Sequence, residues 1–270
     1  MVRFVDDLGA VVPLPSVVAR VVSLVPSLTE ALALTCREKL VGATDWCTHP
    51  ADLVVPRVGG TKNPDLNAIG VLAPDLVVAN AEENRPADLE VLREQGIAVW
   101  VTDIRTVDQA LGSIETLLGA VGSSDVAWLG QARRSWAQPQ AVVEGRRLRA
   151  VVPIWRRPWM HLGSDTYAGD VLRRLGVDNV LGHSPQRYPR LGLDQLPEVD
   201  LVVLPDEPYK FSKADGPESF PAAPCALVSG RQLTWYGPAM IEAPHELRRS
   251  MRAALADAWT PHDVDPPRLE

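Results

Sequence analysis

The sequence has few cysteines and no pairing among them that would indicate a metal finger. Its 270 residues include only Cys36, Cys47 and Cys225, and no two of these form a C-x-x-C pair. A sparse and odd number of cysteines fits a reducing compartment or plain buried thiols. The cysteine content therefore argues against a metal-finger protein.

Long apolar runs and basic runs are also missing. No uncharged apolar stretch approaches the roughly 18–20 residues that a membrane span needs, so we expect no membrane span. The net charge is −7 and no long Lys/Arg run occurs, which argues against a nucleic-acid partner. Residues 1–7 lack the charged and apolar regions of a signal peptide, and no early lipid-accepting cysteine follows. As the sequence stands we expect a cytoplasmic protein, and an extracytoplasmic one only if the start codon is mis-set.

What is present reads as an alternating α/β protein. The composition is 46% hydrophobic and 23% charged, as in ordinary globular domains. Residues 21–25 form a continuous apolar, β-branched run that predicts a buried strand, and we expect Pro26 to stop it. Ser27-Leu28-Thr29-Glu30 then matches the S-x-x-E capping box and predicts the start of a helix. Asn63-Pro64 similarly predicts an N-cap with proline at the first helical position.

The two halves of the chain repeat this architecture, which predicts parallel sheets with helices on both faces. We predict two α/β lobes joined by a long backbone helix, with a ligand cleft between the lobes beyond the carboxyl ends of the strands. Residues 106–145 read as a largely helical connection that Pro139 must kink or break. The expected divisions are an N-terminal lobe at 1–105, a connecting helical segment at 106–145, a C-terminal lobe at 146–260 and a flexible tail at 261–270.

Aromatic residues are scarce, yet tryptophan dominates them. They make up 6% of the chain, and eight of the fifteen are tryptophan. Those expected on loops at the carboxyl ends of strands are Trp46, Trp155, Trp159, Tyr188, Trp235 and Tyr236. Tryptophan and tyrosine offer wide, stiff apolar faces with one polar handle, which suits a large flat ligand. Ordinary packing in the core or anchoring of loops is the alternative for each of them.

Candidate catalytic and metal-binding motifs are weak. Cys47 and His49 share a loop, but two residues do not make a metal site and no H-E-x-x-H supports them. A single axial contact from His49 to the metal of a ligand stays open. Gly59-Gly60-Thr61-Lys62 lacks the spacing of a phosphate loop and reads as a turn. Ser27 is not in a G-x-S-x-G motif, although backbone N–H groups there suit an amide or an anion. We expect no catalytic residues and no protein-only metal site.

Several motifs together resemble a known family. They are RVVSLVPSLTE at 20–30, LVGATDWCTHP at 40–50, VGG at 58–60, NPDL at 63–66, APDLVVA at 73–79, GSDTY at 163–167, LGVDNV at 175–180 and LTWYG at 233–237. In this combination the chain resembles the helical-backbone (class III) substrate-binding proteins of ABC importers for cobalamin, haem and iron siderophores. The resemblance covers most of residues 3–258 and is closest to the cobalamin-binding branch. It implies two α/β lobes joined by one long helix.

The resemblance also implies a ligand and the residues that hold it. The ligand would be cobalamin or a similar tetrapyrrole or metal chelate, with no covalently bound cofactor. Trp46 would stack on the corrin ring, Ser27 would offer backbone contacts, and the aromatic opposite would be Tyr188 or Trp159. The remaining expected binding residues are Cys47, His49, Gly60, Thr61, Trp235 and Tyr236.

Docking on an ABC permease is implied as well, with one departure from the family pattern. Members that dock use an acidic residue on each lobe. Asn67 is neutral at the first of these positions, and Asp194 is acidic at the second. The arginine that often follows Trp-Tyr-Gly is replaced by Pro238. We expect a monomer that has an ABC permease as its macromolecular partner.

Three functions follow from these observations. The first is a receptor that binds a corrinoid or related metal chelate for ABC-type uptake, and that is not an enzyme. The second is a cytoplasmic carrier or sensor of corrinoids or metallocofactors without a transport role. The third is an enzyme on the same fold that uses Asp45, His49 or Glu207.

Overall fold

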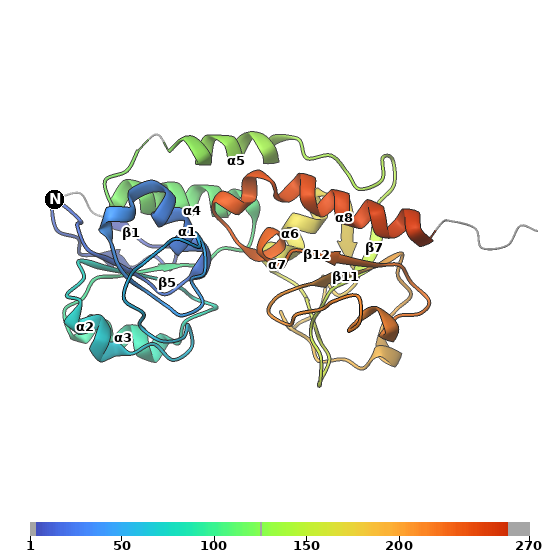
Figure 1. Cartoon of the computed structure of the whole chain (residues 1–270), viewed down its shortest axis with the longest axis horizontal. Helices are drawn as coiled ribbons and strands as arrows, with labels where there is room; N and C mark the ends of the chain where they lie inside the picture. The colour runs from blue at the N-terminus through green and yellow to red at the C-terminus, as the bar shows by residue number, and fades with distance from the viewer. Residues whose placement is uncertain (1–3, 125, 259–270) are drawn as a thin grey trace, which may run out of the picture. The chain divides into compact units, whose positions relative to one another are not determined.

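The computed structural model describes residues 4–124 and 126–258, and the expected tail at 261–270 lies outside these residues (Figure 1). Contacts divide the chain into two units. The first unit is Met1–Ala137 with Trp235–Ile241, and the second is Gln138–Thr234 with Glu242–Glu270. Each unit contains a four-stranded parallel sheet with helices packed on it, which confirms the predicted two-lobe α/β fold. The ligand cleft expected between the lobes stays a prediction.

The first sheet has the order β4-β3-β5-β6, and all its neighbouring strands are parallel. Its strands are β3 (Val21–Ser23), β4 (Leu40–Ala43), β5 (Leu76–Asn80) and β6 (Val99–Thr102). The helical elements of this unit are α1 (Pro26–Cys36), η1 (Arg37–Lys39), α2 (Leu66–Val71), α3 (Pro86–Glu94), α4 (Val107–Ala120), α5 (Ala127–Ala137) and η4 (Pro238–Ile241). Strand β4 pairs with one edge of β3 and β5 pairs with the other. The order in which strands are added to the sheet therefore switches sides at β3, although all strands stay parallel.

Alternation along the strands divides the core of the first unit between two faces. Side chains of β3, β5 and β6 pack with Ile69 of α2 and with Leu89 and Leu92 of α3 in one buried cluster. Helix α1 contacts β3, β4 and α4. Figure 1 shows α2 and α3 on one side of β5 and α1 and α4 on the other. The continuous apolar runs of these strands are thus explained by burial on both faces.

Two helix starts differ from the sequence predictions. Pro26 does not stop the preceding strand; it is the first residue of α1, with Val25 as a cap residue that makes no side-chain hydrogen bond. Proline is suited to this position because its fixed φ is helical and it lacks an N–H that would have no partner. In α2 the cap is Asp65, whose carboxylate accepts a hydrogen bond from the Ala68 N–H at 3.0 Å, and not Asn63.

The second sheet repeats the strand order of the first. It runs β10-β7-β11-β12 and is parallel throughout, while β8 and β9 form a separate antiparallel pair. The strands are β7 (Leu148–Val151), β8 (Pro153–Trp155), β9 (Met160–His161), β10 (Val177–Asn179), β11 (Leu201–Pro205) and β12 (Cys225–Val228). The helical elements are α6 (Tyr167–Arg174), η2 (Leu193–Gln195), η3 (Pro217–Ser219), α7 (Gly230–Thr234) and α8 (Ala243–Ala258).

Helices and loops cover different faces of the second sheet. Helix α6 contacts β10, α8 contacts β12, and α7 contacts both of these helices. Val151, Val202 and Leu204 instead form a cluster with Phe211, which belongs to a loop and not to a helix.

The segment at 106–145 contains two helices. Helix α4 begins after Thr106, whose hydroxyl accepts a hydrogen bond from the Gln109 N–H at 3.1 Å. Helix α5 ends at Ala137, two residues before Pro139. This agrees with the break expected at the proline, because the residue before a proline is disfavoured in helical geometry. Among the described residues, no helix combines the length and the apolar character that crossing a membrane requires.

An N-terminal hairpin of β1 (Phe4–Val5) and β2 (Val11–Val12) is pinned to the edge strand β6 by a buried carboxylate. Asp6 is 5% exposed, and its carboxylate accepts hydrogen bonds from the N–H groups of Leu8 at 3.1 Å, Ala10 at 2.9 Å and Val101 at 3.2 Å. Its two oxygens thereby close the hairpin turn and also satisfy an edge donor of β6, which would otherwise be open to pairing.

We predict that Asp6→Ala lowers the free energy of unfolding by about 1–3 kcal/mol, because it leaves buried backbone donors without an acceptor. Urea denaturation followed by circular dichroism measures this change. The exposed pair of Arg93 and Glu90 supplies a control, since Glu90→Gln should change stability by less than about 1 kcal/mol. Equal effects of the two substitutions would contradict the role given to Asp6.

Candidate functional site

The carboxyl edge of the first sheet gathers most of the predicted binding residues. Ser27 lies in the first turn of α1, directly after β3, and is buried. Trp46 follows β4 and is 66% exposed. Gly60 lies beside it, since a Cβ added to Gly60 would be 3.5 Å from the Trp46 Nε1. A large aromatic side chain is thus displayed at the edge where α/β sheets bind ligands.

Cys47 does not reach the surface. The side chain is completely buried, with its Sγ 2.9 Å from the Thr29 Oγ1 and 3.1 Å from the Thr44 Oγ1. Burial raises the pKa of the Cys47 thiol, and this outweighs the hydrogen bonds to Thr29 and Thr44, which lower it. The thiol is therefore neutral near pH 7, and it faces the inside of the unit.

A short segment from late in the chain completes this edge. Trp235–Ile241 belongs to the first unit, and the Trp235 ring contacts His49 edge to face with ring centroids 5.4 Å apart. Gly237 has φ of +150°, and a Cβ added there would be 3.1 Å from the Ser27 carbonyl oxygen. Only a glycine permits this backbone geometry and this approach to α1. The structure therefore brings Ser27, His49, Trp235 and Tyr236 together.

Tyr236 is the buried polar member of this group. It is 6% exposed, and burial, followed by the charge of Glu83, raises the pKa of its phenol well above the usual value. The nearby hydroxyls of Thr102 and Ser27 act in the opposite direction and are outweighed. The phenol thus stays protonated through the physiological pH range.

Asn80, at the end of β5, organises the loop that follows, and sequence reasoning missed it. Its Oδ1 accepts from the N–H groups of Glu82 at 2.9 Å and Glu83 at 3.2 Å. Asn84 accepts from the Asn80 N–H at 2.9 Å and donates its amide to the Thr61 carbonyl at 2.9 Å. Thr61 is thereby held at this edge through its backbone. The one signal in the sequence is an asparagine that directly follows the apolar run of a predicted strand.

The second unit holds the remaining predicted aromatics in a different setting. Trp159 stacks on Phe211 with ring centroids 6.2 Å apart, on His161 at 6.3 Å, and meets the edge of Phe220 at 5.6 Å. The guanidinium of Arg156 lies over the same indole, 5.3 Å from its centroid. Trp159 is therefore packed largely within its own unit.

Other predicted positions of the second unit are more open to solvent. Trp155, 42% exposed, rests edge to face on Tyr209 and offers more surface than Trp159. Tyr188 is half-buried, and Asp194 is exposed on η2. Asn67, in the first unit, is exposed on α2.

The candidate catalytic and metal-binding residues come from both units. Asp45 and His49 belong to the first unit, whereas Glu207 belongs to the second. Among the described residues, no three His, Cys, Asp or Glu side chains are grouped as the ligands of a metal ion would be.

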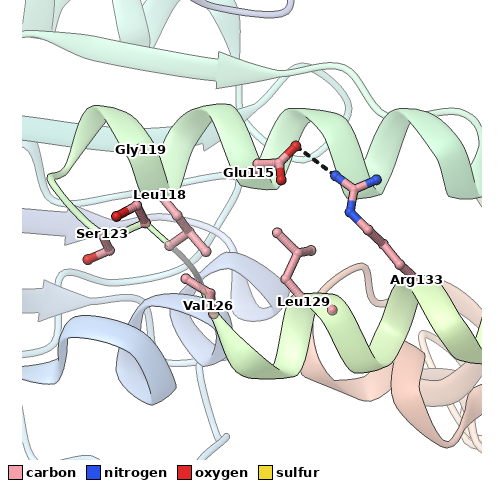
Figure 2. A pocket seen from close by; sticks show the side chains of 9 residues that line it. Glu115, Leu118, Gly119, Ser123, Val126, Leu129 and Arg133 are labelled. Carbon is pink, nitrogen blue, oxygen red and sulfur yellow. Dashed lines mark hydrogen bonds and ion pairs between the residues drawn. The ribbon is translucent and has the colours of Figure 1, made fainter.

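A groove between α4 and α5 is separate from this site (Figure 2). Its volume is about 410 Å³, and Leu118, Val126 and Leu129 form its apolar part. Its two charged residues, Glu115 and Arg133, pair with each other at 2.7 Å. None of the predicted binding residues lines it.

Comparison with known proteins gives relatives of one kind. No model of a known protein family matches the chain. The vitamin B12-binding protein of Vibrio cholerae is 25% identical over 188 residues, which cover 66% of this chain and 66% of that protein. The predicted resemblance to the helical-backbone substrate-binding proteins is confirmed. The relatives found by sequence include vitamin B12-binding proteins, which agrees with the predicted cobalamin-binding branch.

Solved structures of periplasmic binding proteins share the fold. The periplasmic vitamin B12-binding protein BtuF of Vibrio cholerae has a TM-score of 0.69 and 19% identity, covering 88% of this chain and 98% of that one. The periplasmic heme-binding protein BhuT, solved with two hemes, has a TM-score of 0.73 and 24% identity, covering 87% of this chain and 98% of that one. Each of these relatives is named as a binding protein, which bears out the expectation of a binding protein over an enzyme.

One prediction is wrong. The cytoplasmic location was inferred from the first residues and from the sparse cysteines, whereas the substrate-binding proteins that share this fold are described as periplasmic. The composition of a few leading residues is weak grounds for a compartment beside a likeness that covers 88% of the chain.

The buried His161 in the second unit makes a contribution to stability that depends on pH. It is fully buried, and its Nε2 donates to the Leu191 carbonyl at 3.1 Å. Burial lowers the pKa of His161 below its ordinary value of 6.5, and the hydrogen bond to Leu191 only partly offsets this. Because the unfolded chain takes up the proton more readily, this contribution to stability is complete above pH 6.5 and is lost as the pH falls through the lower folded-state pKa.

We therefore predict that stability falls as the pH is lowered from 7.5 to 5, and that His161→Gln makes this fall shallower. Urea denaturation at several pH values measures the slope. The exposed His183 provides the control, and His183→Gln should keep the wild-type slope. If His161→Gln also keeps it, burial of a neutral His161 does not contribute to the pH dependence.

Proposed function

We propose that this chain is an extracytoplasmic receptor of an ABC-type uptake system and binds a corrinoid or a related flat metal chelate. Trp46, Trp235 and His49 at the carboxyl edge of the first sheet provide the apolar contacts. Ser27, Gly60 and Thr61 provide backbone groups for the polar substituents of the ligand.

The exposed indole of Trp46 carries this proposal. A tryptophan that is 66% exposed leaves a large apolar face in water, and a flat ligand that covers this face removes it from water. A corrin or porphyrin ring is broad, flat and mostly apolar, so stacking on the indole removes apolar surface from both. The edge-to-face pair of Trp235 and His49 supplies a second aromatic surface in the same unit.

Among flat chelates we favour a corrinoid over haem. The relatives found by sequence are named for vitamin B12, whereas haem-binding proteins enter through likeness of fold. Trp155 or Tyr188 of the second unit would contact another part of the ligand, since Trp159 is largely packed against its own neighbours. His49 remains a candidate axial ligand of the bound metal.

The macromolecular partner would be a permease. Asp194, exposed on η2, would meet a cationic residue of the permease, and Asn67 on α2 would make a neutral contact. We propose that the protein performs this task as a monomer.

The experiment that tests the proposal is a calorimetric titration of the protein with cyanocobalamin, cobinamide and hemin. Micromolar or tighter binding of the two corrinoids, with weaker binding of hemin, is the expected result. Preference for hemin would assign the receptor to haem instead. Binding of none of the three would refute the proposed function.

Trp46→Ala should weaken corrinoid binding by about 1–3 kcal/mol, as the loss of aromatic anchors commonly does. The control is Trp128→Phe, because Trp128 lies on α5 and donates its indole N–H to the Thr35 hydroxyl at 2.9 Å, away from the sheet edge. Calorimetry should show unchanged affinity for the control. An unchanged affinity for Trp46→Ala would remove Trp46 from the binding site.

A further inference from the structure

We propose that Arg57 and Cys47 are positioning residues, which hold the Trp46 indole in its binding orientation before the ligand arrives. This inference rests on the proposed function, and it gives Cys47 a role other than the ligand contact predicted from the sequence. It is carried by a set of hydrogen bonds that converge on the four residues of the turn that displays Trp46.

Trp46 stands on a tight turn. The Cys47 N–H donates to the Thr44 carbonyl at 3.1 Å, which closes a four-residue turn with Asp45 and Trp46 at its centre. The Thr48 N–H then donates to the Trp46 carbonyl at 2.9 Å. The direction in which the Trp46 side chain leaves the backbone is therefore set by residues 44–48.

Arg57 ties both ends of this turn. Its Nη1 donates to the Thr44 carbonyl at 2.8 Å and to the Cys47 carbonyl at 2.9 Å. The backbone around Arg57 is itself fixed, since the Val58 N–H donates to the Ala43 carbonyl at 3.0 Å in a parallel bridge beside β4. A guanidinium supplies several donors in a rigid plane, so one side chain can donate to both carbonyls at once.

Cys47 anchors the turn on its buried side. Its buried Sγ lies against the hydroxyl of Thr29, which belongs to α1, and against the hydroxyl of Thr44, which begins the turn. The turn is thus fastened to helix α1, which starts at Pro26. The thiol fills a completely buried place, where a larger or a charged side chain would displace the loop.

Gly59 and Gly60 contact another side of the turn that carries Trp46. The Asp45 N–H donates to the Gly59 carbonyl at 2.9 Å, and the indole nitrogen of Trp46 lies close over Gly60. Trp46 is consequently held along its edge and through its backbone while most of its surface stays exposed. Fixing the side chain in advance removes the ordering cost that binding would otherwise include, which is how rigid sites gain affinity.

The first test compares Arg57→Met with a matched arginine. Arg20 also donates to two backbone carbonyls of the first unit, to Leu72 at 2.6 Å and Ala73 at 3.2 Å, but at the start of β3. Both Arg57→Met and Arg20→Met should lower the melting temperature to a similar extent. Only Arg57→Met should weaken cyanocobalamin binding, by roughly three- to tenfold. In a Trp46→Ala background it should cause no further loss, because it acts through Trp46.

The second test examines Cys47 and needs no ligand. Cys47→Val removes the hydrogen bonds of the thiol and Cys47→Ser keeps them, while Cys36→Val alters another buried thiol of the unit as a control. Acrylamide quenching of Trp46, taken as the difference from the same protein carrying Trp46→Phe, reports how the indole is held. Quenching should rise for Cys47→Val and Arg57→Met, and should stay at the wild-type level for Cys47→Ser and Cys36→Val.

The outcomes separate the two proposals. If the wild-type protein binds none of the chelates, the proposed function fails, and quenching alone decides whether Arg57 and Cys47 hold Trp46. Suppose that the wild-type protein binds cyanocobalamin. The positioning role is overturned if the Arg57→Met variant binds equally well. It is also overturned if Arg57→Met weakens binding by the same factor in the Trp46→Ala background as in the wild-type protein. Unchanged quenching in both Arg57→Met and Cys47→Val overturns it as well.

Discussion

All neighbouring strands within each four-stranded sheet run in the same direction, and the placement of the loops that carry the candidate site depends on this constraint. Parallel strands are joined by crossovers, so the segments that leave their carboxyl ends meet at one edge. In the first unit this edge receives Ser27 after β3 and Trp46 after β4. The order β4-β3-β5-β6 reverses at β3, and α1 begins at that point. The chemistry of the site therefore follows from the topology.

The loops at this edge are held by hydrogen bonds from polar side chains. Asn80 and Asn84 hold the loop after β5, and Arg57 and Cys47 hold the turn after β4. Their hydrogen bonds go mostly to backbone groups, so they fix loop shape while leaving the outward side chains free to vary. Such an arrangement suits a fold whose relatives are named for ligands as different as vitamin B12 and heme. A common frame can then display different contact residues.

The sequence predicted what depends on local patterns. Apolar runs such as residues 21–25 located the strands, because strands buried on both faces have no polar alternation. Threonine caps such as Thr106 located helix starts, whereas the proline at 26 misled because proline both ends strands and begins helices. Long-range contacts were beyond reach. Nothing around Cys47 in the sequence shows that Thr29 and Arg57 converge on it, and the burial of Trp159 depends on Phe211 and Phe220 from distant loops.

The return of Trp235–Ile241 to the first unit has a consequence for synthesis on the ribosome. Met240 is fully buried, and its carbonyl accepts the Trp136 indole N–H at 2.8 Å. The first unit is thus complete only when about 100 residues beyond Ala137 have been made, a delay of roughly 5–20 s at ordinary elongation rates. Until then the surfaces of α1 and α5 that receive η4 stay open. The earlier part of the first unit therefore has to wait in an unfinished state, in need of protection from aggregation and from proteases, until Ile241 has been made.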